Sequence, residues 1–389
     1  MNVLGHIIAG VFGAISMVAI VKAAGTSEVN IDFPSDVRAV VSLQDQAGAG
    51  SIGAIAMQKV LLSQINARYL AMAKEILPTS KNVDAVIGYV LSGGHPALAE
   101  AIARSEQLDA TTVRLLEGVA FFARGDRVKA RERLQEVDPL TLPPTASGRL
   151  ALVRAMLLPD GDPLKFEFLE IAAATMPGTL VEESALRRAS LAAVSSGEVN
   201  VFWGKMDRYF RRFNSSPWAA EFSTAAMVQL VKRHKAGMEL DRARLERLLD
   251  RFPASRRLLV YLLVSRTAIR EGLPEIAVFA ARRARRLSLE GSTERLQAEL
   301  YDLAYGVIDD DPAGVRVRLS EIDASRLPSA DQLLLAAALK VVAEIEAGTT
   351  ISPLRNSDGG DEETGDPLEG QVRATMAAAD VVLERGSKQ

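Results

Sequence analysis

The sequence has no cysteine among its 389 residues. This absence excludes disulfide bonds, thiolate metal sites and a thiol nucleophile, but it does not assign a compartment, because many exported proteins also lack disulfides. A strong charge of one sign is missing too, since 46 basic residues face 49 acidic ones. No overall field therefore attracts nucleic acid or anionic lipid, and no nucleic-acid partner is expected.

Residues that carry chemistry are scarce. The three histidines are His6, His95 and His234, and none has a partner at the spacing of a metal site. No glycine-rich phosphate loop follows a strand pattern. We interpret Glu182 and Glu183 as carboxylates of an ordinary helical surface, although a carboxylate pair assembled from distant positions remains open. The sequence therefore predicts no catalytic residues, no metal, no cofactor and no enzymatic activity.

A long hydrophobic run is present only at the start of the chain. Residues 3–21 carry no formally charged side chain at neutral pH, and Lys22 and Ala23 follow them. The small residues here fit cleavage after Ala23, so residues 1–23 are predicted to be an export signal and the protein to be exported. Because no Lys or Arg precedes the run, an uncleaved membrane anchor of spanning length is the alternative.

Strand signals are nearly absent, which indicates an all-α protein. The helical pattern is clearest in residues 111–137, which predict two short amphipathic helices folded into a hairpin. Leu116 and Ala120 lie on the apolar stripe of the first helix, and Gly125 and Asp126 end that helix and cap the next. Neither helix can bury its stripe alone, so the hairpin is expected to stack on others of its kind.

Similar breaks recur along the chain at intervals of 35 to 40 residues. After Gly125 they fall at Gly161, Gly197, Gly237, Gly272, Asp310 and Gly348. A glycine between helix pairs at this period is typical of tetratricopeptide-like arrays, although most consensus positions of that repeat are missing. The predicted fold is therefore a superhelical array of helical hairpins, a degenerate tetratricopeptide-like architecture.

The segment before these hairpins is less regular. Pro34 disfavours helix at Phe33, so residues 26–34 are expected to be extended. The following residues predict a short helix capped by Ser35 and Asp36, a glycine-alanine break over residues 44–51, and a longer helix from Ile52 to before Pro78.

Four segments make up the predicted organisation. Residues 1–23 are the export signal, and residues 24–347 form the helical-hairpin repeat body. Residues 348–367 are rich in Thr, Ser, Pro, Gly and acidic side chains, so we expect a flexible acidic linker there. Residues 368–389 are predicted to form a C-terminal helix.

Candidate partner-binding residues come from an aromatic stretch and a basic one. The aromatic stretch, residues 202–218, holds six of the 20 aromatic residues and has cations on its opposite side. It is interpreted either as a core helix or as a binding site, since Trp, Tyr and Arg dominate interface hot spots. The basic stretch, residues 282–286, is either an anionic-partner surface or a solvated helix edge paired with acidic neighbours. The candidates are Trp203, Tyr209, Phe210, Arg211, Arg212, Trp218, Arg282 and Arg286.

Two stretches carry a family resemblance. DQAGAGSIGAIAMQKVLLSQI (residues 45–65) and VFWGKMDRYFRRFNSSPW (residues 201–218), together with the export signal and the hairpins, resemble the MotC family of periplasmic motility proteins of rhizobial flagellar motors. The resemblance implies a non-enzymatic scaffold that binds the periplasmic part of the stator protein MotB and supports flagellar rotation. It implies no small-molecule substrate, and membrane contact only through the N-terminal segment if that segment is uncleaved.

Two other functions remain open from the sequence. A cell-wall (peptidoglycan) enzyme or regulator built on a helical superhelix would need a compact catalytic domain with an essential glutamate, and no segment outside the repeats provides one. A cytoplasmic repeat adaptor with an apolar N-terminal helix is the other alternative. An active alkaline phosphatase fusion after Gly25 would exclude it.

Overall fold

A computed structural model describes residues 32–73, 76, 78–306 and 311–347. This part of the chain is all-helical, with 17 α-helices, two short 3₁₀-helices and no strand, which confirms the predicted all-α class. No helix within it is long and apolar enough to cross a lipid bilayer. The predicted export signal, acidic linker and C-terminal helix lie outside the described residues.

The helices follow one another with short connections. They are α1 (Phe33–Gly48), α2 (Ile52–Ala71), α3 (Ser80–Leu91), α4 (Ala97–Ala103), α5 (Ala110–Ala123), α6 (Arg127–Leu134), η1 (Pro139–Thr141), α7 (Pro144–Leu157), α8 (Pro163–Thr175), α9 (Leu180–Ser196), α10 (Val199–Arg212), α11 (Ala219–Lys235), α12 (Arg242–Leu249), α13 (Ala254–Glu271), α14 (Pro274–Leu287), α15 (Thr293–Gly306), α16 (Pro312–Ser320), η2 (Ala324–Arg326) and α17 (Ser329–Glu346).

The expected glycine breaks lie between successive helices. Gly125, Gly161, Gly197, Gly237 and Gly272 each separate two helices and each has a positive φ angle. At the first break Gly125 has φ = 80°, and the side chain of Asp126 accepts a hydrogen bond from the backbone N–H of Lys129 at 3.1 Å. Glycine adopts this left-handed conformation without the penalty of a Cβ, so the break is encoded locally. The expected breaks at Asp310 and Gly348 lie outside the described residues.

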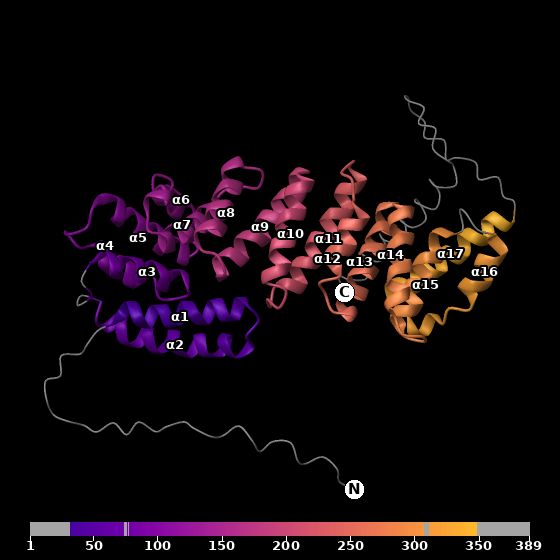
Figure 1. The fold of residues 1–389 in the computed structure, drawn as a ribbon, viewed down its shortest axis with the longest axis horizontal. Helices are drawn as coiled ribbons and strands as arrows, with labels where there is room; N and C mark the ends of the chain where they lie inside the picture. Colours follow the sequence, from indigo (N-terminus) through magenta and orange to yellow (C-terminus); the bar gives the residue numbers. More distant parts are fainter. Residues whose placement is uncertain (1–31, 74–75, 77, 307–310, 348–389) are drawn as a thin grey trace, which may run out of the picture. The chain divides into compact units, whose positions relative to one another are not determined.

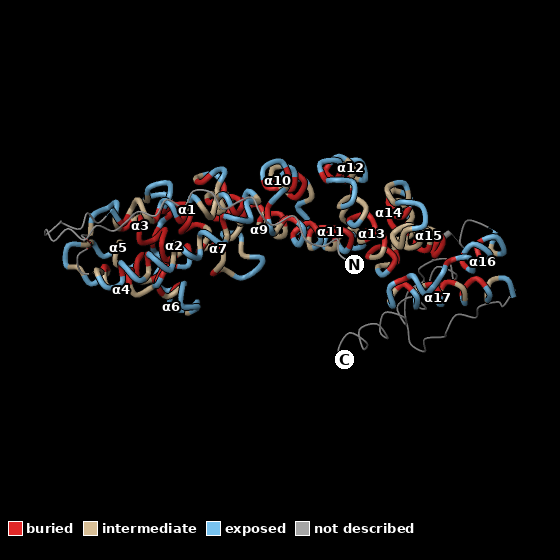
Figure 2. Tube along the Cα trace, turned by 90° about the horizontal axis from the view of Figure 1, so that it is seen from below, coloured by how far each residue is buried: buried red, intermediate tan, exposed pale blue. Residues whose placement is uncertain are grey.

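The α5–α6 hairpin buries the predicted stripe. Leu116 and Ala120 of α5 and Ala130 and Leu134 of α6 are buried. A Cβ at Gly118 would overlap the side chain of Leu134, so glycine at this position lets the two helices approach closely. Buried residues lie where helices meet, and outward faces are exposed (Figure 2).

Helices pack mainly against helices one or two places away along the chain, and the contacts of α3 with α7 and of α1 with α9 span more. Figure 1 shows α1 and α2 lying side by side, and α1 also packs against α3 and α9. At the contact with α9, Asp45 accepts a hydrogen bond from the backbone N–H of Leu180 at 2.8 Å, although the two residues are 135 positions apart. Residue spacing predicts none of this return contact.

The start of α1 corrects one expectation, because this helix begins at Phe33 rather than after Ser35 and Asp36. Proline is tolerated in the first turn of a helix, where its missing N–H has no partner to lose. Phe33 is fully buried against the rings of Tyr69 and Tyr89, with centroid distances of 4.8 and 5.8 Å. Tertiary packing therefore extends the helix over Phe33.

The break after α1 is also shorter than predicted. The helix continues through Gly48, which leaves three residues before α2 instead of the expected break over 44–51. Ala47 and Gly48 are buried, and Gly48 lies against Leu180 of α9. Packing on α9 favours helix in a segment whose composition suggests a loop. As expected, α2 ends before Pro78.

Candidate functional site

The first part of the aromatic stretch lies in α10, whose apolar face is core. Phe202, Trp203, Tyr209 and Phe210 are all buried in this helix. The ring of Phe210 is in contact with that of Phe222 on α11, with centroids 5.7 Å apart. Trp203, Tyr209 and Phe210 have almost no exposed surface. They therefore belong to the core and hold α10 in place, in agreement with the interpretation of this stretch as a core helix.

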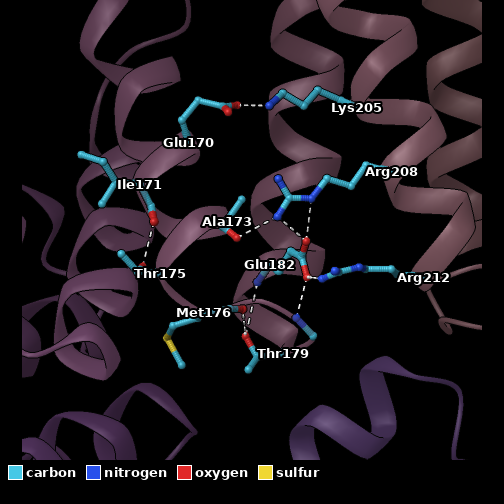
Figure 3. Close-up of polar contacts among 11 residues, drawn as sticks. Glu170, Ile171, Ala173, Thr175, Met176, Thr179, Glu182, Lys205, Arg208 and Arg212 are labelled. Atoms are coloured by element: carbon cyan, nitrogen blue, oxygen red, sulfur yellow. Dashed lines mark hydrogen bonds and ion pairs between the residues drawn. The ribbon is translucent and has the colours of Figure 1, made fainter.

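The opposite side of α10 carries cations that pair with acids of α8 and α9. Glu182, in the first turn of α9, is fully buried and accepts hydrogen bonds from Arg208 Nε and Arg212 Nη1, both at 2.7 Å (Figure 3). The backbone N–H of Gly178 donates to the same carboxylate at 2.5 Å. Lys205 forms an ion pair with Glu170 on α8. These pairs fix α10 against the helices that precede it.

Glu183 is buried beside Glu182, which corrects the interpretation of both as surface carboxylates. Glu183 accepts hydrogen bonds from Tyr209 Oη at 2.6 Å and Ser216 Oγ at 3.2 Å, and Arg187 Nη2 lies 3.4 Å away. Two adjacent carboxylates are tolerated because each has several donors and both lie at a helix N-terminus, where the dipole favours negative charge. The two arginines of α10 that bind Glu182 lie one helical turn apart, and this spacing is the feature of the sequence that could have indicated buried acids here.

The hydroxyl of Tyr209 stays protonated. Burial, and secondarily the negative charge of Glu183, raise the pKa of Tyr209 well above its ordinary value of 10.0. The hydroxyl therefore donates a hydrogen bond and does not act as a base near neutral pH. Since donors of the chain itself occupy both glutamates, this arrangement orients helices rather than presenting a reactive group.

The remaining candidates on this side of the chain reach solvent. Arg211 is exposed and forms no ion pair within the described residues. Trp218 is half-buried at the start of α11, and the guanidinium of Arg187 lies 5.8 Å from its ring centroid. Arg212 is exposed but bonded to Glu182. Arg211 and Trp218 are therefore the candidates with the most freedom to contact a partner.

The basic stretch on α14 is largely paired. Arg282 Nε lies 3.0 Å from Asp302, and Arg285 lies 3.8 Å from Glu299, as the solvated-edge interpretation expects. Arg286 is exposed and has no ion pair in the part of the chain that the structure describes. The helix α12 lies between the two groups of candidates: it packs against α10, and its Arg242 forms an ion pair with Glu275 of α14.

Metal ligands do not cluster in the described residues, where no group of three or more His, Asp or Glu side chains could hold an ion. The Nδ1 atom of His234 lies 2.9 Å from the backbone carbonyl oxygen of Met238 and 3.2 Å from the backbone nitrogen of Leu240. These contacts tie the turn after α11 to the helix, which sequence reading did not predict.

Comparisons with known proteins agree with the family resemblance. The family described as chemotaxis protein MotC matches residues 3–387 of the chain. A curated relative, the chemotaxis protein MotC of Rhizobium meliloti (strain 1021), is 29% identical over 328 residues, which cover 84% of this chain and 74% of the relative. No solved structure matches the chain.

Proposed function

The chain belongs to the MotC family of chemotaxis proteins, and from this membership we propose that it is a periplasmic scaffold required for flagellar rotation. It binds the periplasmic part of the stator protein MotB and catalyses no reaction. The family match over residues 3–387 is the observation that carries the proposal, because it spans nearly the whole chain.

The scaffold is a superhelical array of degenerate tetratricopeptide-like hairpins. The glycine breaks at regular intervals and the packing of helices on their neighbours support this architecture. An array of this kind offers a long binding surface without needing a catalytic domain.

Partner contact is assigned to candidate residues that reach solvent. Arg211 and Trp218 near the α10–α11 connection, and Arg286 on α14, supply the side-chain types that are enriched in interfaces. The α2 helix adds Ile52 and Val60, which are 85% and 60% exposed. Trp203, Tyr209 and Phe210 support this surface from the core. Arg212 and Arg282, which both form ion pairs, lie at its edges.

Export can be tested with an alkaline phosphatase fusion after Gly25. Because this enzyme is active only outside the cytoplasm, we expect activity from the fusion. A second fusion that lacks residues 3–21 serves as the control and is expected to be inactive. An inactive first fusion would show that the protein stays in the cytoplasm, which would contradict a periplasmic scaffold.

Motility can be tested with a deletion strain and matched variants. The deletion is expected to assemble flagella that rotate poorly or not at all, and the wild-type gene to restore swimming. An Arg211→Ala, Trp218→Ala variant is expected to restore less swimming and to capture less MotB in a periplasmic pull-down. Arg114→Ala, which alters an exposed arginine on α5, is the control. Normal swimming of the deletion strain, or clearing of peptidoglycan in zymography, would contradict the proposal.

A further inference from the structure

A cavity of about 340 Å³ lies where α1, α3, α5, α7 and α9 meet the start of α11. It exists because α1 returns to pack on α9, so helices from distant parts of the sequence form its walls. The walls are mostly apolar and include Leu91, Phe122, Leu152, Met156, Met176 and Trp218. A concave, largely apolar space with a few polar groups is the usual form of a small-molecule site, and this volume lies at the lower end of the usual range.

One of the polar groups is a buried cation. Arg149 of α7 is 9% exposed and lines the cavity. Its Nη1 donates to the backbone carbonyl of Thr145 at 3.2 Å, and among the described residues no carboxylate lies within 4.0 Å of its guanidinium. Burial lowers the pKa of Arg149, but an arginine remains charged in proteins. A buried charge without a close counter-ion is costly, so an anion entering the cavity would relieve that cost.

The nearest acids are already engaged. Asp45 lines the cavity but accepts a hydrogen bond from the backbone N–H of Leu180. Asp84 accepts a hydrogen bond from the hydroxyl of Thr145 at 2.8 Å. Both act on Arg149 from beyond ion-pair distance. The guanidinium therefore keeps donors available to a ligand.

A second arginine lines the same cavity. The Nε atom of Arg187 is buried and has no hydrogen-bond partner within the described part of the chain. Its Nη2 lies 3.4 Å from Glu183, and its guanidinium lies over the ring of Trp218. Two guanidinium groups from α7 and α9 thus border one apolar space.

We propose that this cavity binds a small molecule with a single carboxylate on an apolar body. The carboxylate accepts hydrogen bonds from Arg149 and Arg187, because the planar guanidinium matches the geometry of a carboxylate. The apolar body lies against Leu152, Met156 and Trp218. A monoanion fits better than a dianion such as phosphate, since Asp45 contributes a negative charge to the same walls. Trp218 also belongs to the proposed partner surface, but the carboxylate site is argued from the cavity alone and does not rest on the scaffold role.

Calorimetric titration of the full chain with octanoate, octan-1-ol and octylamine tests the proposal. Octanoate is expected to bind about tenfold or more tighter than octan-1-ol, since hydrogen bonds to charged groups are worth at least a factor of this size, and octylamine is expected to bind weakest. Arg149→Met should weaken octanoate binding about tenfold or more and leave octan-1-ol binding nearly unchanged. Arg114→Met, which removes an exposed arginine outside the cavity, is the matched control.

Two further variants keep the proposal falsifiable if Arg149→Met does not fold. Ser184→Phe fills the cavity without changing its charge and is expected to abolish binding of all three probes. In a Trp203→Phe background, Trp218 is the remaining tryptophan, and its emission should shift on addition of octanoate. No octanoate binding at millimolar concentration, equal binding of octanoate and octan-1-ol, or unchanged octanoate binding by Ser184→Phe would each overturn the assignment.

Discussion

The hydroxyl of Tyr209 is one of the donors that make a buried Glu183 tolerable. Replacing Tyr209 by Phe removes the 2.6 Å hydrogen bond and leaves the carboxylate with fewer donors in a site that water does not reach. We expect the free energy of unfolding to fall by about 1–3 kcal/mol, measured by urea denaturation. Tyr261→Phe is the control, because the Tyr261 hydroxyl makes no hydrogen bond within the described residues. Equal losses in the two variants would contradict the role of Glu183.

Asp45 is expected to make the protein less stable as pH rises, which is the opposite of the usual contribution of a carboxyl group. Burial raises the pKa of Asp45 above its ordinary value of 3.8, against the smaller opposing effects of the Leu180 N–H and Arg149. A carboxyl whose pKa is raised by folding contributes stability below the unfolded pKa, and this contribution is lost as pH rises through the folded pKa. Asp45→Asn is therefore expected to gain stability relative to wild type at neutral pH, with the difference shrinking towards pH 3.8.

The control for Asp45 is a carboxyl shifted in the opposite direction. Hydrogen bonds from the side chain and backbone of Thr112 lower the pKa of Asp109, which caps α5. The contribution of Asp109 to the free energy of unfolding is present above its pKa in the unfolded chain and is lost as pH falls through its pKa in the folded protein. Asp109→Asn should thus lose stability relative to wild type at neutral pH, and this loss should shrink on acidification. Urea denaturation across the same pH series measures the free energy of unfolding of both variants relative to wild type. If this difference changes with pH in the same direction for both variants, the assignment is contradicted.

At the scale of elements, the turn between α1 and α2 depends on a glycine for two reasons. Gly50 has φ = 106°, and a Cβ there would lie 2.5 Å from the carbonyl oxygen of Ser215 in the α10–α11 connection. Gly125 also has a positive φ but has open space around it. Gly125→Ala is expected to cost about 1–2 kcal/mol from backbone strain alone. Gly50→Ala should cost clearly more, because it also pushes α1–α2 away from that connection.

Thermal or urea unfolding of the two glycine variants measures the difference. If Gly50→Ala and Gly125→Ala lose the same stability, the close approach of Gly50 to Ser215 does not contribute to folding. The comparison isolates tertiary contact from local conformation, since both positions require the same left-handed region.

At the scale of the whole molecule, packing mainly between sequence neighbours predicts that damage stays local. Leu319 of α16 and Leu116 of α5 are both fully buried, and each substitution by Ala is expected to cost about 2–5 kcal/mol. Since α16 packs against α15 and α17, Leu319→Ala should lower hydrogen-exchange protection there and leave α5 and α6 protected. Leu116→Ala is the reciprocal control. A uniform loss of protection in either variant would show that the described helices open as one unit.

The sequence by itself determined the all-α class and the glycine breaks between successive helices. An apolar stripe of helical period and a glycine with positive φ at Gly125, Gly161 or Gly272 are local features, so residue spacing suffices to predict them. The same reasoning identified the aromatic helix and the family resemblance, because both depend on stretches that are contiguous in the chain.

Only the tertiary structure decided which polar side chains are buried and where α1 packs. Glu182 and Glu183 look like surface carboxylates in sequence, but arginines about 26 to 30 residues away neutralise Glu182 and Tyr209 binds Glu183. The contact of Asp45 with Leu180 spans 135 residues and creates the cavity under α1. Such contacts depend on how whole helices pack, and no periodicity within a short window carries that information.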